Sequence, residues 1–242
     1  MLTPDVMMPI AIARLLRNGE SVFHGVASPL PMVAILVAKH LHAPDLIYLN
    51  ITGSTDPTPE HLPRSTVDPA LFAHTRSRVT LTDLFDLSAR GRLDTAFLSG
   101  VQIDQHANIN MSLIPGPNGD LQRPKVRLPG GAGSAAIMPS ARRTILWRTR
   151  HDPRTFVMRV SFRTTGGNVD RVVTPLCVFK RVQGLLEIES IHPYVTPDEV
   201  TRQTGWPLAV AADVLRTPEP TADELAALRD VDPDNVRLVE FS

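Results

Sequence analysis

The sequence predicts an α/β fold in which a single open, mixed but mainly parallel sheet is flanked by helices. A strand–helix–strand pattern over residues 21–54 is typical of a βαβ unit, whose two strands run parallel. The composition, with 43% hydrophobic and 21% charged residues in 242, is that of a globular protein with a sizeable core. We therefore expect one domain over residues 1–242.

The N-terminal half is expected to alternate helices with buried strands. Residues 1–20 predict a helix, with Thr3 as its N-cap and Pro4 in its first turn. The next predicted segments are a buried strand over 21–31, a helix over 31–40 and a second strand over 45–54. After them come a proline-rich loop over 56–69, a helix over 71–89 and a third buried strand over 93–100.

The middle of the chain is less regular. Residues 102–129 are rich in Asn, Gly and Pro and predict a long irregular segment, a feature that is usually functional. Small residues over 128–138 predict a turn that leads into a helix, and 143–148 predict a short strand. Residues 154–163 alternate in polarity and predict a half-buried strand. Its expected inner face holds Phe156, Met158, Val160 and Phe162.

The C-terminal third begins with a predicted pair of strands over 172–180 and 184–190. Thr196 starts a capping box, which predicts a helix that ends near Gly205, and a second box starts at Thr221. Residues 209–242 are acidic and predict a solvated helical extension.

The charge balance excludes several classes of protein. The chain has 25 basic and 25 acidic residues, which argues against nucleic-acid or membrane-surface partners. Its longest apolar stretch, 29–38, is shorter than the about 20 residues that span a bilayer. The first twenty residues do not read as a signal peptide, because charged residues flank and interrupt their apolar run. A cytoplasmic protein is expected.

Several catalytic and metal motifs are absent from the sequence. The eight histidines match no zinc spacing, and we expect no metal site. No serine elbow and no phosphate-binding P-loop occurs. The single cysteine, Cys177, excludes an internal disulfide and is interpreted as a buried apolar residue. The basic stretch 142–171 fits either exposed strand positions or a phosphate site.

Four segments, taken in order, carry a resemblance to a known family. They are 25–49 (GVASPLPMVAILVAKHLHAPDLIYL), 91–110 (GRLDTAFLSGVQIDQHANIN), 128–137 (LPGGAGSAAI) and 172–208, which ends in VTPDEVTRQTGWPL. Together they resemble the β subunit of the family I CoA-transferases. The resemblance implies a CoA-transferase/NagB-like sheet, an α-type partner subunit in an α2β2 heterotetramer, and a CoA thioester as substrate. Coenzyme A is then part of the substrate, and no separate cofactor is implied.

Two groups of candidate residues lie in these segments. Gly130, Gly131, Ala132 and Gly133 form a loop without large side chains, whose backbone N–H groups can approach CoA or an oxyanion closely. The second group is Gln102, Asp104, Asn108 and Asn110, which matches the family pattern Q-x-D-x-x-x-N-x-N. We expect these four side chains to hold an irregular loop through hydrogen bonds to its backbone.

The sequence departs from the family at one position. The resemblance implies a glutamate just after the second strand, where the carboxylate attacks the acyl-CoA and becomes a glutamyl-CoA thioester. Here Asn50 stands at that position, and an amide is neutral and a poor nucleophile. We expect Asn50, Thr52 and Gly53 to form a wall of the active site. The nearest carboxylates are Asp56 and Glu60.

With this substitution, the chain most resembles the β subunit of bacterial steroid ring-cleaving hydrolases within the wider family. That likeness implies C–C bond hydrolysis in the last carbocyclic ring of a steroid-derived β-keto acyl-CoA, with the essential carboxylate on the α subunit. Two alternatives stay open. The chain could be a transferase subunit with a displaced carboxylate, or a non-catalytic ligand-binding or scaffold subunit.

Overall fold

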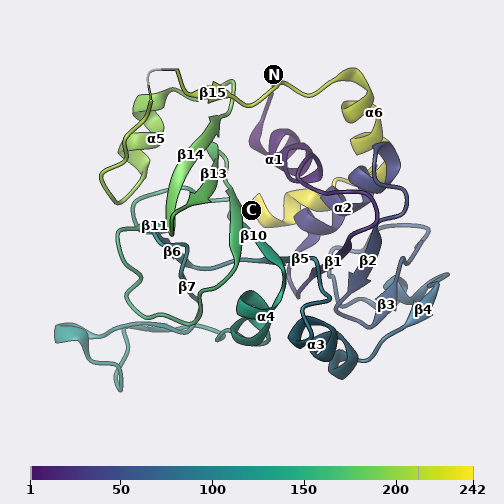
Figure 1. Ribbon diagram of the computed structural model, residues 1–242, viewed down its shortest axis with the longest axis horizontal. Coiled ribbons are helices and arrows are strands. Elements are labelled where there is room, and N and C mark those ends of the chain that lie inside the picture. Colours follow the sequence, from purple (N-terminus) through teal and green to yellow (C-terminus); the bar gives the residue numbers. More distant parts are fainter. Residues whose placement is uncertain (1, 212, 242) are drawn as a thin grey trace. The chain divides into compact units, whose positions relative to one another are not determined.

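The computed structural model describes residues 2–211 and 213–241 (Figure 1). These form two compact units. The first contains residues 2–97 and 218–241, and the second contains 98–211 and 213–217. The predicted α/β fold is confirmed, with a mixed, mostly parallel sheet flanked by helices. The two units are described separately, and one domain over the whole chain stays a prediction.

The first unit is built on parallel strands. The strands of this unit are β1 (Ser21–His24), β2 (Ile47–Asn50), β3 (Ser54–Thr55), β4 (Ser77–Arg78) and β5 (Thr95–Leu98), in the order β5-β1-β2-β3-β4. β1 pairs in parallel with both β2 and β5, whereas β2, β3 and β4 pair antiparallel. All four residues of β1 are buried, as expected of a strand between two parallel neighbours.

Helices cover this sheet. They are α1 (Pro4–Ala13), α2 (Pro29–Leu41), α3 (Leu81–Ala89) and α6 (Ala222–Val231), with the short 3₁₀ helices η1 (Pro69–Phe72) and η3 (Val236–Phe241). α2 packs against α1, α6 and η3, so the C-terminal residues return to the N-terminal half of the chain. Arg14 joins the same two ends, because its guanidinium pairs with Glu224 at 2.6 Å.

The second unit combines parallel and antiparallel strands. Its larger set has the order β15-β14-β13-β12-β10, made of β10 (Arg143–Trp147), β12 (Val169–Val173), β13 (Cys177–Val182), β14 (Leu185–Ile191) and β15 (Leu215–Arg216). A second sheet joins β6 (Gln102–Asp104), β7 (Ile109–Asn110) and β11 (Phe156–Val157). Short elements complete it: β8 (Leu113–Ile114), β9 (Val126–Arg127), η2 (Pro117–Gly119), α4 (Ser134–Ser140) and α5 (Pro197–Gln203).

Two predicted helices in the first unit are wrong in extent. The N-terminal helix ends at Ala13 rather than residue 20, and Gly19 then takes a left-handed turn with φ +79°. Residues 71–89 are not one helix, because only Leu81–Ala89 is α-helical. Thr80 and Asp83 form a capping box at its start, which fixes the beginning of the helix ten residues later than predicted.

The predicted strand over 154–163 is also wrong, since only Phe156–Val157 is a strand. Met158, expected on the inner face, is 50% exposed. Here side chains, rather than a neighbouring strand, accept hydrogen bonds from the backbone N–H groups. Val160 N–H donates to Asp104, and Ser161 N–H donates to Gln102. The alternating pattern therefore marks a segment held by polar side chains.

Other predicted strands are confirmed with changed bounds. The pair predicted over 172–190 is the antiparallel hairpin β13–β14, preceded by the separate strand β12. The irregular segment 102–129 contains the short strands β6 to β9. The extension over 209–242 contains β15, α6 and η3. Within the described residues, no helix is long and apolar enough to cross a membrane.

Candidate functional site

The carboxyl ends of β1 and β2 bring polar side chains together in the first unit. The parallel register pairs His24, the last residue of β1, with Asn50, the last residue of β2. Ligands of open α/β sheets bind at this end of parallel strands. Asn50, where the family resemblance implies a nucleophile, therefore lies at the carboxyl end of the parallel strands, where a ligand is expected to bind.

Asn50 lies in a cluster of buried hydrogen-bonding side chains. Its amide nitrogen donates to the Tyr48 hydroxyl at 2.9 Å, and that hydroxyl is 2.5 Å from Nε2 of His24. The two rings are stacked, with their centroids 5.3 Å apart. Nδ1 of His24 in turn lies 2.7 Å from the Ser28 hydroxyl. We call His24, Ser28, Tyr48 and Asn50 the Asn50 cluster.

The Asn50 cluster is electrically neutral. Burial lowers the pKa of His24 to about 4, so its ring is uncharged near neutral pH. Burial also raises the pKa of the Tyr48 hydroxyl, which keeps it protonated. Among the described residues, no carboxylate is hydrogen-bonded to these four side chains. The cluster therefore offers hydrogen bonds rather than a charge or a nucleophile.

The predicted wall residues differ in their exposure. Asn50 is only 1% exposed, and its amide oxygen accepts the Thr52 N–H at 2.8 Å, so its side chain closes the turn after β2. Thr52 and Gly53 are half-buried and form the more accessible part of this turn. Gly53 has φ +98°, and a Cβ there would lie 2.5 Å from the Val79 carbonyl oxygen. Only glycine fits this position.

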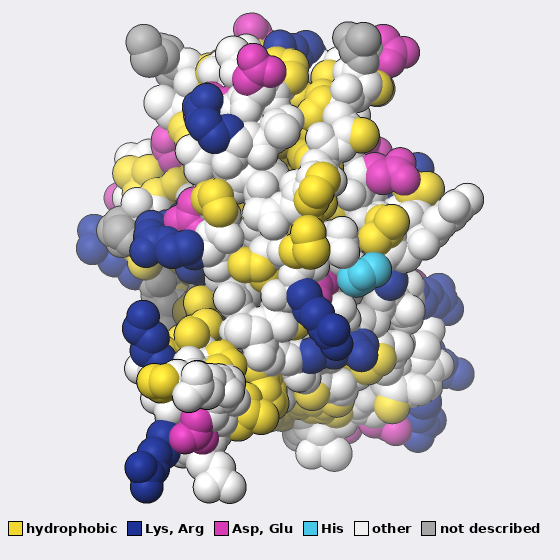
Figure 2. Space-filling model, turned by 90° about the vertical axis from the view of Figure 1, so that its left-hand side faces the viewer, with side chains coloured by type: hydrophobic (Ala, Val, Ile, Leu, Met, Phe, Trp, Pro, Cys, Tyr) yellow, Lys and Arg dark blue, Asp and Glu magenta, His cyan; other side chains and the backbone are white. Residues whose placement is uncertain are grey.

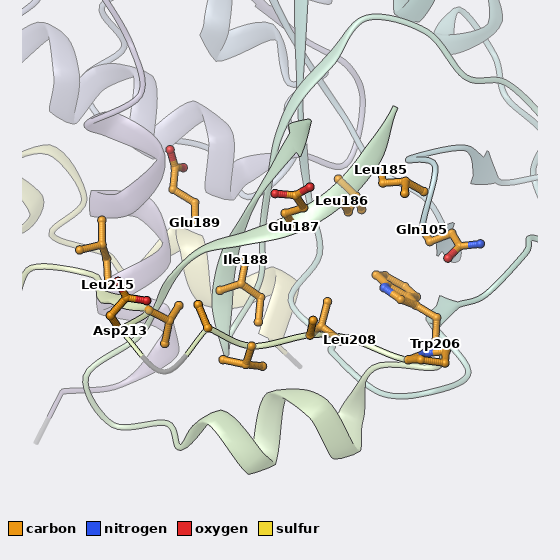
Figure 3. A pocket seen from close by; sticks show the side chains of 15 residues that line it. Gln105, Leu185, Leu186, Glu187, Ile188, Glu189, Trp206, Leu208, Asp213 and Leu215 are labelled. Carbon is orange, nitrogen blue, oxygen red and sulfur yellow. The ribbon is translucent and has the colours of Figure 1, made fainter. Parts of the chain in front are cut away.

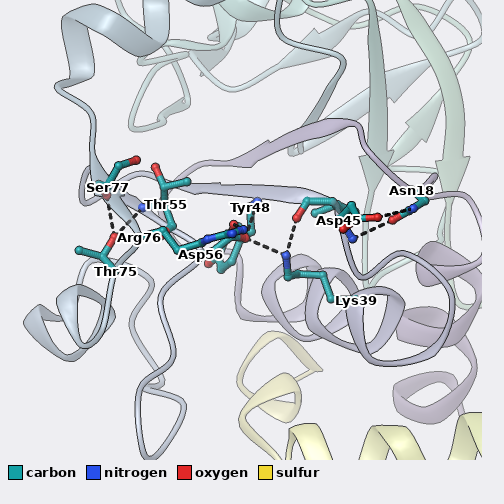
Figure 4. A network of polar contacts seen from close by, with 10 residues as sticks. Asn18, Lys39, Asp45, Tyr48, Thr55, Asp56, Thr75, Arg76 and Ser77 are labelled. Atoms are coloured by element: carbon teal, nitrogen blue, oxygen red, sulfur yellow. Dashed lines mark hydrogen bonds and ion pairs between the residues drawn. The ribbon is translucent and has the colours of Figure 1, made fainter.

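The two carboxylates nearest to Asn50 in the sequence have different surroundings in the structure. Asp56 is buried and accepts from Lys39 Nζ at 2.8 Å and from the Tyr48 N–H at 3.0 Å, with Arg76 3.5 Å away (Figure 4). Its charge is therefore used within the fold. Glu60 is exposed in the proline-rich loop.

The second unit holds the amide and carboxylate residues of the 102–110 segment. Asp104 Oδ1 accepts the N–H groups of His106 at 3.0 Å and Asn108 at 2.9 Å, and the Asn108 amide donates back to it at 3.2 Å. The Asp104 side chain thereby closes the tight turn at Ala107, whose φ is +62°. It also reaches Val160 N–H at 3.3 Å.

Gln102 and Asn110 tie the same segment to its neighbours. The Asn110 amide nitrogen donates to Gln102 Oε1 at 2.9 Å and to the Leu113 carbonyl at 2.8 Å. Gln102 Oε1 also accepts from the Ser161 hydroxyl at 2.7 Å. All four side chains of the Q-x-D-x-x-x-N-x-N pattern thus bond to loop backbone or to one another.

The glycine loop of residues 130–133 exposes backbone donors. Gly130 has φ +95° and donates its N–H to the Met111 carbonyl at 2.7 Å. The Gly131 carbonyl accepts from Ser134, which begins α4. In the part of the chain that the structure describes, the N–H groups of residues 131–133 donate to no protein acceptor. They are available to a ligand, and Gly131 has no room for a Cβ, which would lie 2.6 Å from Thr164 Cγ2.

A separate hollow of about 560 Å³ lies along β14 in the second unit (Figure 3). Its walls are mainly apolar, with Leu186, Ile188, Trp206 and Leu208 among them. Glu187 and Glu189 are on the same strand, and Glu189 pairs with Arg171 at 2.6 Å. None of the candidate site residues predicted from the sequence lines this hollow.

Ion pairs account for several arginines of the basic stretch 142–171. Arg171 pairs with Glu189, Arg143 lies 3.5 Å from Asp170, and Arg150 pairs with Asp152. On the face drawn in Figure 2, basic side chains stand in separate groups among acidic and apolar ones. In the described residues no cluster of three metal-ligating side chains occurs.

Reasoning from the sequence missed His24, Ser28 and Tyr48. A signal was present, since His24 directly follows the apolar residues Val22 and Phe23. Tyr48 and Asn50 have i, i+2 spacing and therefore share a face of β2. The predicted residues fall into two sets. Asn50, Thr52 and Gly53 lie in the first unit, whereas the glycine loop and the four residues of the 102–110 segment lie in the second.

The fold and the polar carboxyl ends of β1 and β2 define a class, that of α/β proteins with an open, mostly parallel sheet. The coenzyme A transferase profile matches residues 6–203, and the chain belongs to this family. It is 33% identical to the B subunit of 3-oxoadipate CoA-transferase from Pseudomonas knackmussii, over 92% of this chain and 90% of that one. It is 31% identical to the cholesterol ring-cleaving hydrolase IpdB subunit of Rhodococcus jostii, over 66% of this chain and 67% of that one.

Solved structures give the same result. The decarboxylase AibA/AibB matches with a TM-score of 0.91 and 32% identity, over 99% of both chains. Rhodococcus jostii IpdAB matches with a TM-score of 0.84 and 26% identity, over 100% of this chain and 99% of that one. The predicted family is thus confirmed, and the first of these structures is named as a decarboxylase rather than a transferase.

Proposed function

We propose that this chain is the β subunit of an α2β2 cytoplasmic enzyme that opens the last carbocyclic ring of a steroid-derived β-keto acyl-CoA. The observation that carries the proposal is the neutral Asn50 cluster where a transferase is implied to carry its glutamate. A chain without that carboxylate forms no glutamyl-CoA thioester. The likeness to the ring-cleaving IpdB subunit supports the same assignment.

The reaction is a hydrolysis of a C–C bond. A water activated by a carboxylate of the α subunit adds its oxygen to the ring ketone and gives up a proton. The bond between that carbon and the α-carbon of the thioester then breaks, its electron pair forms a thioester enolate, and a proton returns to the α-carbon. The free N–H groups of residues 131–133 would stabilise the enolate oxygen.

The test is to co-express the chain with an α-type subunit and supply 2-oxocyclohexanecarboxyl-CoA in ¹⁸O-labelled water. The expected product is a ring-opened acyl-CoA that carries one ¹⁸O in its new carboxylate. If the complex instead transfers CoA to acetate and borohydride traps a glutamyl thioester on this chain, the proposal is wrong.

A second candidate function is the decarboxylation of a carboxylated acyl-CoA, favoured by the 32% identity to the decarboxylase AibA/AibB over 99% of the chain. Loss of CO₂ would leave the same type of thioester enolate, and a site without a carboxylate on this chain would not repel the substrate's own. Release of CO₂ with no uptake of ¹⁸O distinguishes this function from ring hydrolysis.

The glycine loop gives a prediction for either reaction. Gly131→Ala would place a Cβ 2.6 Å from Thr164 Cγ2 and displace the loop, so we expect kcat to fall about 100-fold, the loss typical of one oxyanion donor. Thr164→Ser removes that methyl group but keeps the hydroxyl that accepts the Met111 N–H. Steady-state kinetics of the double variant should therefore recover most of kcat. Equal losses in the single and double variants would exclude the Thr164 methyl group as the cause and would leave the contact with Ser134 Oγ, 3.0 Å from the same Cβ.

A further inference from the structure

In the Asn50 cluster, the Asn50 amide nitrogen determines which group donates and which accepts in each of the following hydrogen bonds. Because the Asn50 amide nitrogen donates to the Tyr48 hydroxyl, the phenolic proton is directed to its other neighbour, Nε2 of His24. Nε2 therefore accepts, and the ring proton of His24 resides on Nδ1. There it faces the Ser28 hydroxyl at 2.7 Å and the Gly25 carbonyl at 3.0 Å.

The Ser28 hydroxyl takes part in this series of hydrogen bonds and does not cap the helix that follows it. It is the N-cap residue of α2, where a serine oxygen ordinarily accepts from the first helical N–H groups. Its side chain makes no such bond and donates to the Gly25 carbonyl. The helix start is satisfied from elsewhere, because Glu240 accepts the Leu30 N–H at 2.7 Å. The hydroxyl of Ser28 is thus committed to the cluster.

At the other end, the chain of bonds reaches the turn after β2. The Asn50 amide oxygen accepts the Thr52 N–H at 2.8 Å, and the Asn50 carbonyl accepts the Gly53 N–H at 2.9 Å. The orientation of one amide therefore sets the backbone of residues 50–53. If this amide rotated, the Thr52 N–H would lose its acceptor.

We propose that Ser28, His24 and Tyr48 are positioning residues that hold the Asn50 amide in one orientation and thereby fix the turn of residues 50–53. The proposal rests on the proposed function in one respect, that this turn forms a wall of the acyl-CoA site. Burial supports it, because His24 and Ser28 are fully buried and Tyr48 is 1% exposed, so water does not compete for these bonds.

The alternative is that the cluster merely satisfies buried polar groups. Tyr48→Phe separates the two roles, since it keeps the ring and removes the link between His24 and Asn50. Thr66→Val is the matched control. Thr66 is also fully buried, and its hydroxyl donates to the Gly25 carbonyl at 3.2 Å, but no hydrogen bond joins it to His24, Ser28, Tyr48 or Asn50. Both variants lose one buried hydroxyl, but Tyr48→Phe breaks two hydrogen bonds and Thr66→Val breaks one, so Tyr48→Phe should lose more stability.

The first measurement uses the full-length ¹⁵N-labelled chain and needs no substrate. NMR should show the Nδ1–H tautomer of His24. The amide hydrogen of Thr52 should exchange about tenfold faster in Tyr48→Phe than in the wild type, and at the wild-type rate in Thr66→Val. If Tyr48→Phe does not fold, Ser28→Ala removes the first link instead. Equal exchange at Thr52 in both variants would overturn the proposal.

The second measurement uses the complex with its α subunit and 2-oxocyclohexanecarboxyl-CoA. A displaced turn should lower kcat about tenfold in Tyr48→Phe with KM within about twofold, while Thr66→Val keeps both constants. If neither variant changes kcat, the cluster is only structural. If the wild-type complex opens no ring but the exchange result holds, the proposed function fails and the positioning of the turn stands.

Discussion

Replacing Asp56 with alanine is expected to lower the free energy of unfolding by about 3 kcal/mol, the loss typical when one partner of a buried ion pair is removed. Asp56 is 8% exposed and accepts from Lys39 Nζ at 2.8 Å, and the variant leaves this half-buried ammonium without its partner. The Tyr48 N–H, 3.0 Å from the carboxylate, also loses its acceptor. Urea denaturation of the full chain measures the change.

The same variant decides whether this carboxylate does chemistry. A displaced nucleophile would be needed for activity even when the chain is folded, so the activity of Asp56→Ala per folded molecule should stay close to the wild type. Glu60→Gln is the control, because Glu60 is exposed and its loss should change neither stability nor activity. A folded Asp56→Ala complex with no activity would restore the transferase alternative.

Most of the fold could be predicted because it depends on local patterns. The βαβ unit shows apolar runs broken by prolines. β1 and β2 lie within the predicted segments, and α2 begins two residues before and ends one residue after its predicted bounds. The capping box at Thr221 likewise marks the start of α6. These signals are local, so a single sequence carries them.

The failures have a common physical cause, which is that distant side chains decide the local structure. Residues 154–163 alternate like a strand, yet Asp104 and Gln102 take the N–H groups of Val160 and Ser161. The sequence of residues 154–163 alone does not indicate that Asp104 and Gln102 will accept these hydrogen bonds. The start of α2 also depends on a distant side chain, because Glu240 rather than the N-cap residue Ser28 accepts the Leu30 N–H.

For the candidate site, the sequence predicted that Asn50 replaces the family glutamate, but not how its side chain is arranged among its neighbours. The resemblance pointed to Asn50, but it did not show that this side chain is 1% exposed and turned toward Tyr48. The depth of the cluster comes from the register of β1 and β2, which places His24 beside Asn50. Parallel pairing joins residues that are distant in sequence, and the order of residues alone does not state it.

The second large effect is expected on acidification, because three buried histidines are neutral in the fold. Burial is the first cause in each case: it lowers the pKa of His24 and of His192 to about 4, and that of His151 to about 3. His151 packs against Phe156, with ring centroids 4.1 Å apart, which leaves little room for a hydrated imidazolium. An unfolded chain releases each ring to its ordinary pKa of 6.5.

The direction of the effect follows from proton counting. Between pH 6.5 and about 4, the unfolded chain binds protons at these three rings and the folded chain does not, so acid favours unfolding. Each ring contributes a slope of about 1.4 kcal/mol per pH unit, and three contribute about 4 kcal/mol per pH unit near pH 5. Above about pH 8 the unfolded rings are neutral too, so the contribution is complete and stability should not change further through these groups.

Urea denaturation at several pH values from 4.5 to 7 measures this slope on the full chain. His151→Gln should reduce it by about 1.4 kcal/mol per pH unit, because one proton fewer is taken up on unfolding. His40→Gln is the matched control, since this histidine is exposed and its removal should leave the slope unchanged. A slope that is the same in the wild type and in His151→Gln would mean that the His151 ring is already charged in the folded protein. That result would assign the counter-charge to Asp152, whose charge favours the protonated His151 ring, and the contribution of the buried histidines would then come from His24 and His192.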